Sequence, residues 1–238
     1  MCRMGGKINV IHPNLLINSK TLKRMTRKKK WSISVVVLIV LAVVGHGTLR
    51  WAWKYYGLPE LPDRKNYNSV EERAEAALAF AKRHGMSERY AIFVDYRIPS
   101  GTPRLMVWDF KTKTVKTTTY AMHGSGGGST AERPRFSNKP GSNCSSLGRF
   151  AVTKEHGSRL KRSFRIKGMD SDNQSAYARG LMIHPAVWVN RWCGKKYIPL
   201  NEVACRGCVT VASRGMDEII SLVKQEKKPL LLWNYYSL

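Results

Sequence analysis

An uncharged and strongly apolar run near the amino terminus constrains the fold of this chain more than any other feature. It extends from Ser32 to Leu49, and Lys28, Lys29 and Lys30 stand just before it. Positive charge ahead of an apolar run keeps that end of the segment in the cytoplasm. A full membrane span needs roughly 20 apolar residues, so a cleaved signal and an uncleaved anchor both fit. We therefore expect the rest of the chain to fold outside the cytoplasm.

This segment divides the chain of 238 residues into four predicted parts. Residues 1–30 are a basic cytoplasmic tail, although Met25 would by itself begin a conventional signal. Residues 31–53 are the signal peptide or membrane anchor, and residues 54–68, which hold two prolines, are a linker. Residues 69–238 are long enough to bury one core, whereas two full domains would be tight.

The chain carries a formal net charge of +25, and this excess is not confined to its amino-terminal end. Ten of the 41 Lys and Arg residues lie in residues 1–50, which contain no acid. A basic surface favours anionic partners such as nucleic acid, anionic lipid or acidic cell-wall polymers. No helix-turn-helix or aromatic-basic motif is present, and an exported location also argues against nucleic acid.

The part after the linker is predicted to be mostly β with a small α component. Short runs rich in β-branched and aromatic residues, separated by turn residues, predict strands. These runs cover residues 90–96, 104–110, 114–122, 149–153, 162–166, 181–183 and 230–235. Ser69 and Glu72 form a capping box for a helix that ends at Gly85. A second helix is predicted over residues 216–224 and a short one over residues 170–179.

Polar clusters at the ends of predicted strands are the candidates for chemistry. They contain His123, His184 and Cys208. A cysteine acyltransferase needs a thiolate, an imidazole that generates it, and amide donors for the oxyanion. Gly207 allows a sharp turn before Cys208, so that neighbouring N–H groups can point at the developing charge. The 24-residue spacing of His184 and Cys208 is weak support by itself, because such pairs occur by chance.

The spacing Cys205-x-x-Cys208 is also typical of a redox pair or half of a metal site. A redox pair normally opens a helix, whereas strands surround this one, and zinc would need more ligands than the nearby Cys193. In an oxidising compartment Cys205 could instead pair with Cys193, Cys144 or Cys208. The sequence leaves this pairing open.

Four segments of the sequence resemble the L,D-transpeptidase catalytic domain family, in its large Gram-negative branch. They are HGSGGGS followed by FSNKPGSNCSSLGRF, then IHPAVWV, then CRGCVTV. The likeness covers roughly residues 90–236, and residues 136–150 are its most specific part. The resemblance implies a mostly β (α+β) fold, a sandwich or barrel with one or two peripheral helices, behind the amino-terminal segment. It also implies work on peptidoglycan without a cofactor or metal.

The resemblance implies a covalent reaction on the stem peptides of peptidoglycan. Cys208 matches the nucleophile, His184 its general base, and the amides of Gly207 and Cys208 fall at the oxyanion site. The thiolate would attack the carbonyl after the third residue of a tetrapeptide stem and expel D-alanine. The acyl group would then pass to an amine or to water, so transferase and hydrolase activity both remain open. The place of action would be the periplasm, with an inner-membrane anchor or after signal cleavage.

Further residues match the walls of the family's substrate cleft. His123 and Gly124 match its HG-rich loop, and Ser146 lies in the segment that packs beside the cleft. Arg206, next to the nucleophile, either binds a stem carboxylate or is simply exposed. Pro185 and Cys205 depart from the family, which commonly has glycine and serine there. A catalytically weak or inactive peptidoglycan-binding relative is therefore the alternative.

Overall fold

The computed structural model describes residues 27–56, 70–156, 162–203 and 205–236 of the chain. It divides into two compact units, Met1–Arg50 and Trp51–Leu238. Most of the predicted tail and linker lies outside the described residues. The predicted signal or anchor falls in helix α2 (Arg27–Tyr56), whose apolar side chains between Val35 and Val44 are exposed. Within the described part of the chain, no helix meets the length and apolarity of a membrane span. The predicted transmembrane segment is thus not supported.

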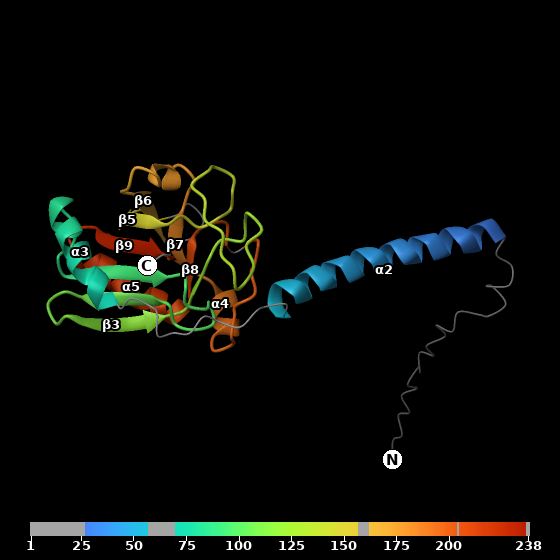
Figure 1. The fold of residues 1–238 in the computed structure, drawn as a ribbon, viewed down its shortest axis with the longest axis horizontal. Helices are drawn as coiled ribbons and strands as arrows, with labels where there is room; N and C mark the ends of the chain where they lie inside the picture. Colours follow the sequence, from blue (N-terminus) through green and yellow to red (C-terminus); the bar gives the residue numbers. More distant parts are fainter. Residues whose placement is uncertain (1–26, 57–69, 157–161, 204, 237–238) are drawn as a thin grey trace, which may run out of the picture. The chain divides into compact units, whose positions relative to one another are not determined.

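Nine strands of the second unit form a single curved sheet (Figure 1). Its order is β3-β2-β1-β9-β5-β6-β7-β8-β4, with β1–β9 and β7–β8 parallel and the other pairs antiparallel. The strands are β1 (Tyr90–Asp95), β2 (Leu105–Asp109), β3 (Thr114–Thr119), β4 (Ala121–Met122), β5 (Gly148–Val152), β6 (Phe164–Gly168), β7 (Met182–Pro185), β8 (Val209–Val211) and β9 (Leu230–Tyr235). Only Tyr120 separates β3 from β4, although they stand at opposite ends of this order. The sheet therefore curls into a nearly closed barrel, which confirms the mostly β prediction.

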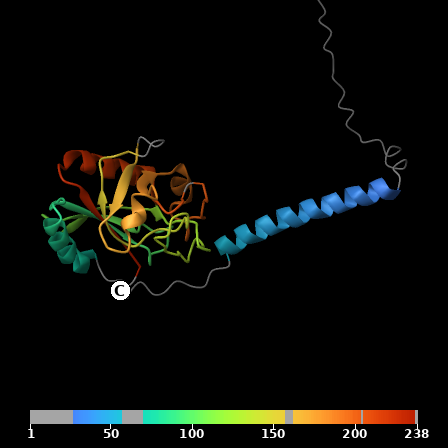
Figure 2. The ribbon, with the colours of Figure 1, turned by 90° about the horizontal axis from the view of Figure 1, so that it is seen from above.

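Two helices cover opposite faces of the sheet (Figure 2). Side chains alternate between the faces of a strand, and β1 shows this directly. Ile92 and Val94 belong to the cluster that buries helix α5 (Ser213–Gln225). Ala91 and Phe93 belong to the cluster that buries helix α3 (Val70–Arg83). Both faces of β1 are consequently buried, which explains why all six of its residues are buried.

Helix α3 agrees with its prediction, and the structure shows how it ends. Gly85 has a φ of +62°, a conformation that glycine adopts without steric cost. The amide of Met86 then donates to the carbonyl of Ala81 over 2.9 Å, which satisfies one of the last carbonyls of the helix. The predicted N-cap, Ser69, lies outside the described residues.

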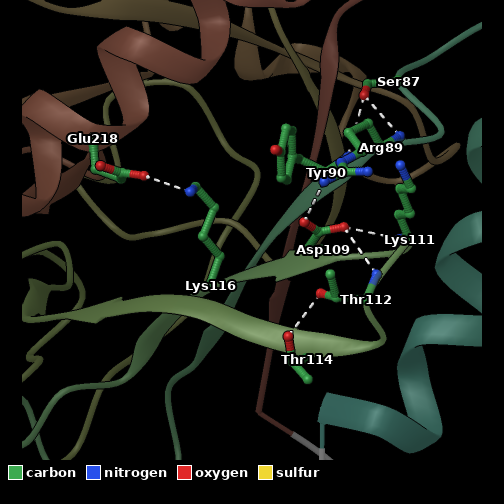
Figure 3. Close-up of polar contacts among 9 residues, drawn as sticks. All are labelled: Ser87, Arg89, Tyr90, Asp109, Lys111, Thr112, Thr114, Lys116 and Glu218. Carbon is green, nitrogen blue, oxygen red and sulfur yellow. Dashed lines mark hydrogen bonds and ion pairs between the residues drawn. The ribbon is translucent and has the colours of Figure 1, made fainter.

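Side-chain hydrogen bonds fix the hairpin between β2 and β3 (Figure 3). Asp109 Oδ1 accepts hydrogen bonds from the amides of Lys111 and Thr112, and its Oδ2 pairs with Arg89 at 2.8 Å. Lys116 on β3 reaches Glu218 on α5 at 3.5 Å, so an ion pair also links this edge of the sheet to a helix.

The structure corrects two details of the prediction. Residues 170–179 form only the short 3-10 helix η2 (Gln174–Ala176), because the side chain of Asn173 is used elsewhere. Its amide nitrogen donates to the carbonyls of Leu147 and Arg149, and its oxygen accepts from the amide of Asp170. Such side-chain bonds to the backbone compete with helix formation.

A helix that was not predicted, α4 (Val187–Trp192), follows β7. It begins two residues after Pro185, where the chain has just left the sheet. Trp188 Nε1 donates to the carbonyl of Pro199 over 2.7 Å and ties this helix to the connection that leads towards β8.

Candidate active site

The parallel pairing of β7 with β8 determines where His184 and Cys208 lie. Ile183 pairs with Val209 and His184 pairs with Thr210, so Cys208 stands one position before the paired run. Because side chains alternate along a strand, His184 and Cys208 occupy the same face of the sheet as Thr210. The β7–β8 ladder thus begins one residue after Cys208, with His184 in its second pair.

The imidazole of His184 is held in one tautomer. Its Nδ1 lies 3.1 Å from the carbonyl oxygen of Pro185, and a carbonyl only accepts, so Nδ1 carries the hydrogen. Nε2 of the neutral ring is then an acceptor, and it lies 3.4 Å from Thr210 Oγ1. Burial lowers the pKa of His184. Near neutral pH the ring is therefore neutral. Its described hydrogen bonds join Nδ1 to Pro185 and Nε2 to Thr210.

The thiol of Cys208 lies at a nearly closed position, with 9% of the residue exposed. Burial raises its pKa, while the backbone N–H of Met182 and the positive charge of Arg179 lower it. These two groups act on the thiolate because each offers positive charge to it. Among the described contacts of His184, none reaches Cys208.

Gly207 makes the turn that carries the nucleophile. Its φ is +98°, and a Cβ at this position would lie 2.5 Å from the carbonyl oxygen of Cys144. Both the backbone conformation and the close contact therefore require glycine. This sharp turn is the feature that would let main-chain amides face a developing oxyanion.

The second cysteine of the turn is buried beneath it. Cys205 is fully buried, and burial raises the pKa of its thiol to about 12. Its Sγ lies 3.2 Å from Thr210 Oγ1 and 3.5 Å from the carbonyl oxygen of Cys208. In the described part of the chain Cys144, Cys193, Cys205 and Cys208 are all free thiols.

The ring of His123 is enclosed in the interior of the domain. It is fully buried, with Arg104 Nη2 donating to its Nδ1 over 3.0 Å and its Nε2 donating to the carbonyl of Thr130 over 2.8 Å. Burial, reinforced by the charge of Arg104, lowers the pKa of His123 to about 3. Next to it, the amide of Gly124 donates to Ser145 Oγ over 2.9 Å. This histidine positions a loop and does not reach the surface.

The comparison with protein families gives a direct result. A family model described as the L,D-transpeptidase catalytic domain matches residues 63–233. The chain belongs to the L,D-transpeptidase catalytic domain family. This membership confirms the resemblance seen in the sequence and relates the protein to peptidoglycan.

Two solved structures are similar to this chain at low identity. The helical cell shape determining protein Pgp2 from Campylobacter jejuni is 11% identical with a TM-score of 0.41, covering 71% of this chain and 57% of Pgp2. This chain therefore spans little more than half the length of Pgp2. An L,D-transpeptidase (residues 123–326) from Xylanimonas cellulosilytica is 13% identical with a TM-score of 0.35, covering 75% of this chain and 98% of the other. At these values the likenesses add nothing to the family assignment. The comparison with curated proteins gave no match.

One residue of this transpeptidase-family domain was missed by sequence reasoning. Arg179 stands between η2 and β7 and holds the loop that contains Ser146. Its Nη1 donates to the carbonyl of Ser137 over 2.9 Å and to Ser146 Oγ over 2.6 Å. No motif marks this arginine, and its position directly before the histidine strand was the only available signal.

The remaining predicted site residues differ in exposure. Ser146 is buried, with 1% exposed, whereas Arg206 is exposed and its Nε donates to the carbonyl of Glu202 over 3.3 Å. Among the predicted site residues, Arg206 is therefore the one whose charged side chain is exposed to solvent, next to the turn that carries Cys208. Among the described residues, no three His, Cys, Asp or Glu side chains gather into a metal-binding group.

Proposed function

We propose that this L,D-transpeptidase-family protein is a peptidoglycan-modifying cysteine acyltransferase that acts on tetrapeptide stems. The observation that supports the proposal is the β7–β8 register, in which His184 pairs with Thr210, two residues after Cys208 in the chain. The Cys208 thiolate attacks the carbonyl after the third stem residue and forms a thioester. The bond to D-alanine breaks, and the leaving amine takes the proton that the thiol gave up.

His184 is the base that moves this proton. Its Nδ1–H is held by the carbonyl of Pro185, so Nε2 is the atom that gains the proton. Hydrogen bonds of catalytic groups are often long before substrate binds, and we expect the pair to approach in the complex. The family's glycine after the histidine is replaced by proline, but the carbonyl of Pro185 still orients the ring.

Thr210 supports His184 through a single hydroxyl hydrogen. In the resting site Thr210 Oγ1 lies 3.4 Å from Nε2 of His184 and 3.2 Å from Sγ of Cys205. When Nε2 becomes protonated it turns into a donor. The hydroxyl then accepts from the imidazolium and donates to Cys205, which stabilises the charged ring.

The other site residues take supporting roles. The amides of Gly207 and Cys208 stabilise the oxyanion, and Arg206 binds a carboxylate of the stem. Gly124 and Ser146 shape the wall of the cleft, and His123 positions the HG-rich loop from inside. The acyl group is transferred to an amine of another stem or to water.

We further propose that residues 69–238 are the catalytic domain and act outside the cytoplasm. The basic residues in the first turn of α2 and the exposed apolar side chains between Val35 and Val44 support a targeting role for residues 31–53. Basic residues throughout the chain favour an acidic wall polymer as the partner.

The second candidate function is a peptidoglycan-binding relative with little or no activity. The burial of Cys208 favours it, because a thiol whose pKa is raised is a poor nucleophile until its base arrives. This alternative keeps the fold and the wall ligand but removes the reaction.

Incubation of the purified protein with tetrapeptide muropeptides distinguishes the two functions. Mass spectrometry should show release of D-alanine and an acylated Cys208 peptide in the wild type, and neither in Cys208→Ala. Cys193→Ala is the matched control, since it removes a thiol near α4 and should keep activity. Binding of muropeptide without D-alanine release by the reduced wild type would overturn the enzyme in favour of the binding module.

A further inference from the structure

Arg179 binds a single loop through both terminal nitrogens of its guanidinium. Nη1 donates to the carbonyl of Ser137 and to Ser146 Oγ, at 2.9 and 2.6 Å. Nη2 donates to Ser142 Oγ and to the carbonyl of Cys144, at 3.1 and 2.8 Å. The acceptors precede Arg179 by 33 to 42 residues in the sequence. All four acceptors are neutral oxygens, so the described partners leave the positive charge of Arg179 uncompensated.

The loop held by Arg179 touches the turn of the nucleophile. The carbonyl oxygen of Cys144 accepts from Arg179 Nη2 and also lies against Gly207, where an added Cβ would be 2.5 Å away. Arg179, the Cys144 carbonyl and Gly207 therefore form a continuous contact that ends at Cys208. We expect a displacement of the guanidinium to move the Cys144 carbonyl that packs against Gly207.

The charge of Arg179 also reaches Cys208 itself. Burial raises the pKa of the Cys208 thiol, and the positive charge of Arg179 acts in the opposite direction. Burial in turn lowers the pKa of Arg179, and the Cys144 and Cys208 thiolates raise it. The titratable groups around Cys208 include Tyr96, Arg179, His184 and Cys205. Arg179 is the permanent cation in this set, because a guanidinium stays protonated near neutral pH.

We propose that Arg179 is a positioning residue of the reaction: it fixes the loop of residues 137–146 against the nucleophile turn and stabilises the Cys208 thiolate. The proposal rests on the proposed function for its effect on turnover, but its effect on the thiol does not depend on any enzymatic activity. A planar guanidinium suits this task because each of its terminal nitrogens donates in a fixed direction within one plane. The ammonium group of a lysine has no such fixed geometry.

Alkylation of Cys208 by iodoacetamide, followed at the peptide level by mass spectrometry across a pH series, tests the charge. Arg179→Gln should raise the apparent pKa of Cys208, so that its alkylation near neutral pH is slower than in the wild type. Arg179→Lys keeps the charge and should leave this pH profile close to that of the wild type. Arg191→Gln removes an exposed arginine at the end of α4 and is the control for net charge.

Turnover of tetrapeptide muropeptides tests the fixing of the loop. Arg179→Lys should raise KM more than it lowers kcat, because the charge remains while the forks to Ser146 and Cys144 are lost. A pH profile of Arg179→Gln that coincides with the wild type overturns the thiolate half of the proposal. Unchanged KM and kcat in Arg179→Lys overturn the positioning half.

Two further results keep the outcome clear. If Arg179→Gln fails to fold by circular dichroism, Arg179→Met replaces it as the variant without charge, with the same expected profile. If the wild type releases no D-alanine but Arg179→Gln still shifts the alkylation profile, the proposed function fails and the role of Arg179 at the thiol stands. If the wild type is active but neither charge-free variant shifts the alkylation profile, the proposed function stands and the role of Arg179 at the thiol fails.

Discussion

Arg104 donates a hydrogen bond from Nη2 to Nδ1 of His123 over 3.0 Å, with both side chains fully buried. Arg104 also donates from Nε to the carbonyl of Ala121 and from Nη1 to the carbonyl of Ile98. A guanidinium cannot accept, so Nδ1 of His123 must be unprotonated and the proton stays on Nε2. The HG-rich loop is thereby attached to the strands beneath it through a neutral imidazole.

This neutral histidine predicts a loss of stability in acid. In the unfolded chain the pKa of histidine is about 6.5, whereas burial and Arg104 lower the folded pKa of His123 to about 3. Between these values the unfolded chain binds a proton that the folded chain does not. The free energy of unfolding should therefore fall as pH drops through this window, by about 1.4 kcal/mol per pH unit from this group.

Urea unfolding at a series of pH values checks this expectation. The variant His123→Gln lacks the titrating ring and should show a shallower decline than the wild type between about pH 6.5 and 3. The lowered pKa of His184 acts in the same direction and remains in the variant. Parallel curves for both proteins would show that His123 does not control the decline.

Replacement of Gly207 by alanine should remove activity and reduce stability. The φ of +98° disfavours a side chain, and the new Cβ would press on the Cys144 carbonyl. Residues held in such conformations typically cost about 1–3 kcal/mol. Gly194→Ala is the matched control, since Gly194 has a φ of +77° and an added Cβ there would meet no atom within 4 Å.

Chemical unfolding and D-alanine release should both be measured on this pair of variants. We expect Gly194→Ala to lose stability through its backbone conformation alone and to keep activity. Full activity in Gly207→Ala would contradict the requirement for this turn.

Loss of the Thr210 hydroxyl should slow the reaction without changing the fold. Thr210→Val has nearly the same shape but cannot bond to His184 or Cys205. A hydrogen bond of this kind contributes about 0.5–1.5 kcal/mol, so kcat should fall roughly two- to tenfold. Thr210→Ser keeps the hydroxyl and should retain most of the activity. Equal kcat values for the valine and serine variants would exclude the hydroxyl from the proton transfer.

Cys205 should behave as a structural residue rather than a second nucleophile. Its thiol is fully buried, with a pKa raised to about 12, and so it is almost entirely protonated near neutral pH. Iodoacetamide should therefore modify Cys208 well before Cys205 in the folded protein. Cys205→Ser introduces the residue common in the family and should keep activity. Faster alkylation of Cys205 than of Cys208 would reverse this assignment.

Local features of the fold were predictable, and contacts between distant segments were not. Strand β9 (Leu230–Tyr235) was predicted with the observed bounds, because its apolar run is short and follows a proline. The division of residues 114–122 into β3 and β4 was missed, since it depends on pairing with β2 on one side and β8 on the other.

The candidate site shows the same limit. The order of motifs pointed to His184 and Cys208, because the nucleophile and its base have recognisable neighbours in sequence. No sequence pattern indicated that His123 would be buried, because that depends on Arg104 from an adjacent part of the sheet. Arg179 was missed for the same reason, as its four acceptors belong to a loop more than 30 residues earlier.

The connection between β7 and β8 contains a helix that does not take part in the pairing of the two strands. Main-chain hydrogen bonds between the two strands fix His184 opposite Thr210, and these bonds do not depend on side-chain identity. Helix α4 and the residues that follow it lie between the two catalytic candidates in sequence, yet outside that ladder. Substitutions in α4 therefore leave the hydrogen bonds of this ladder unchanged, while β7 and β8 stay paired. In evolutionary terms, the sequence of α4 can drift independently of the strand pairing beside it.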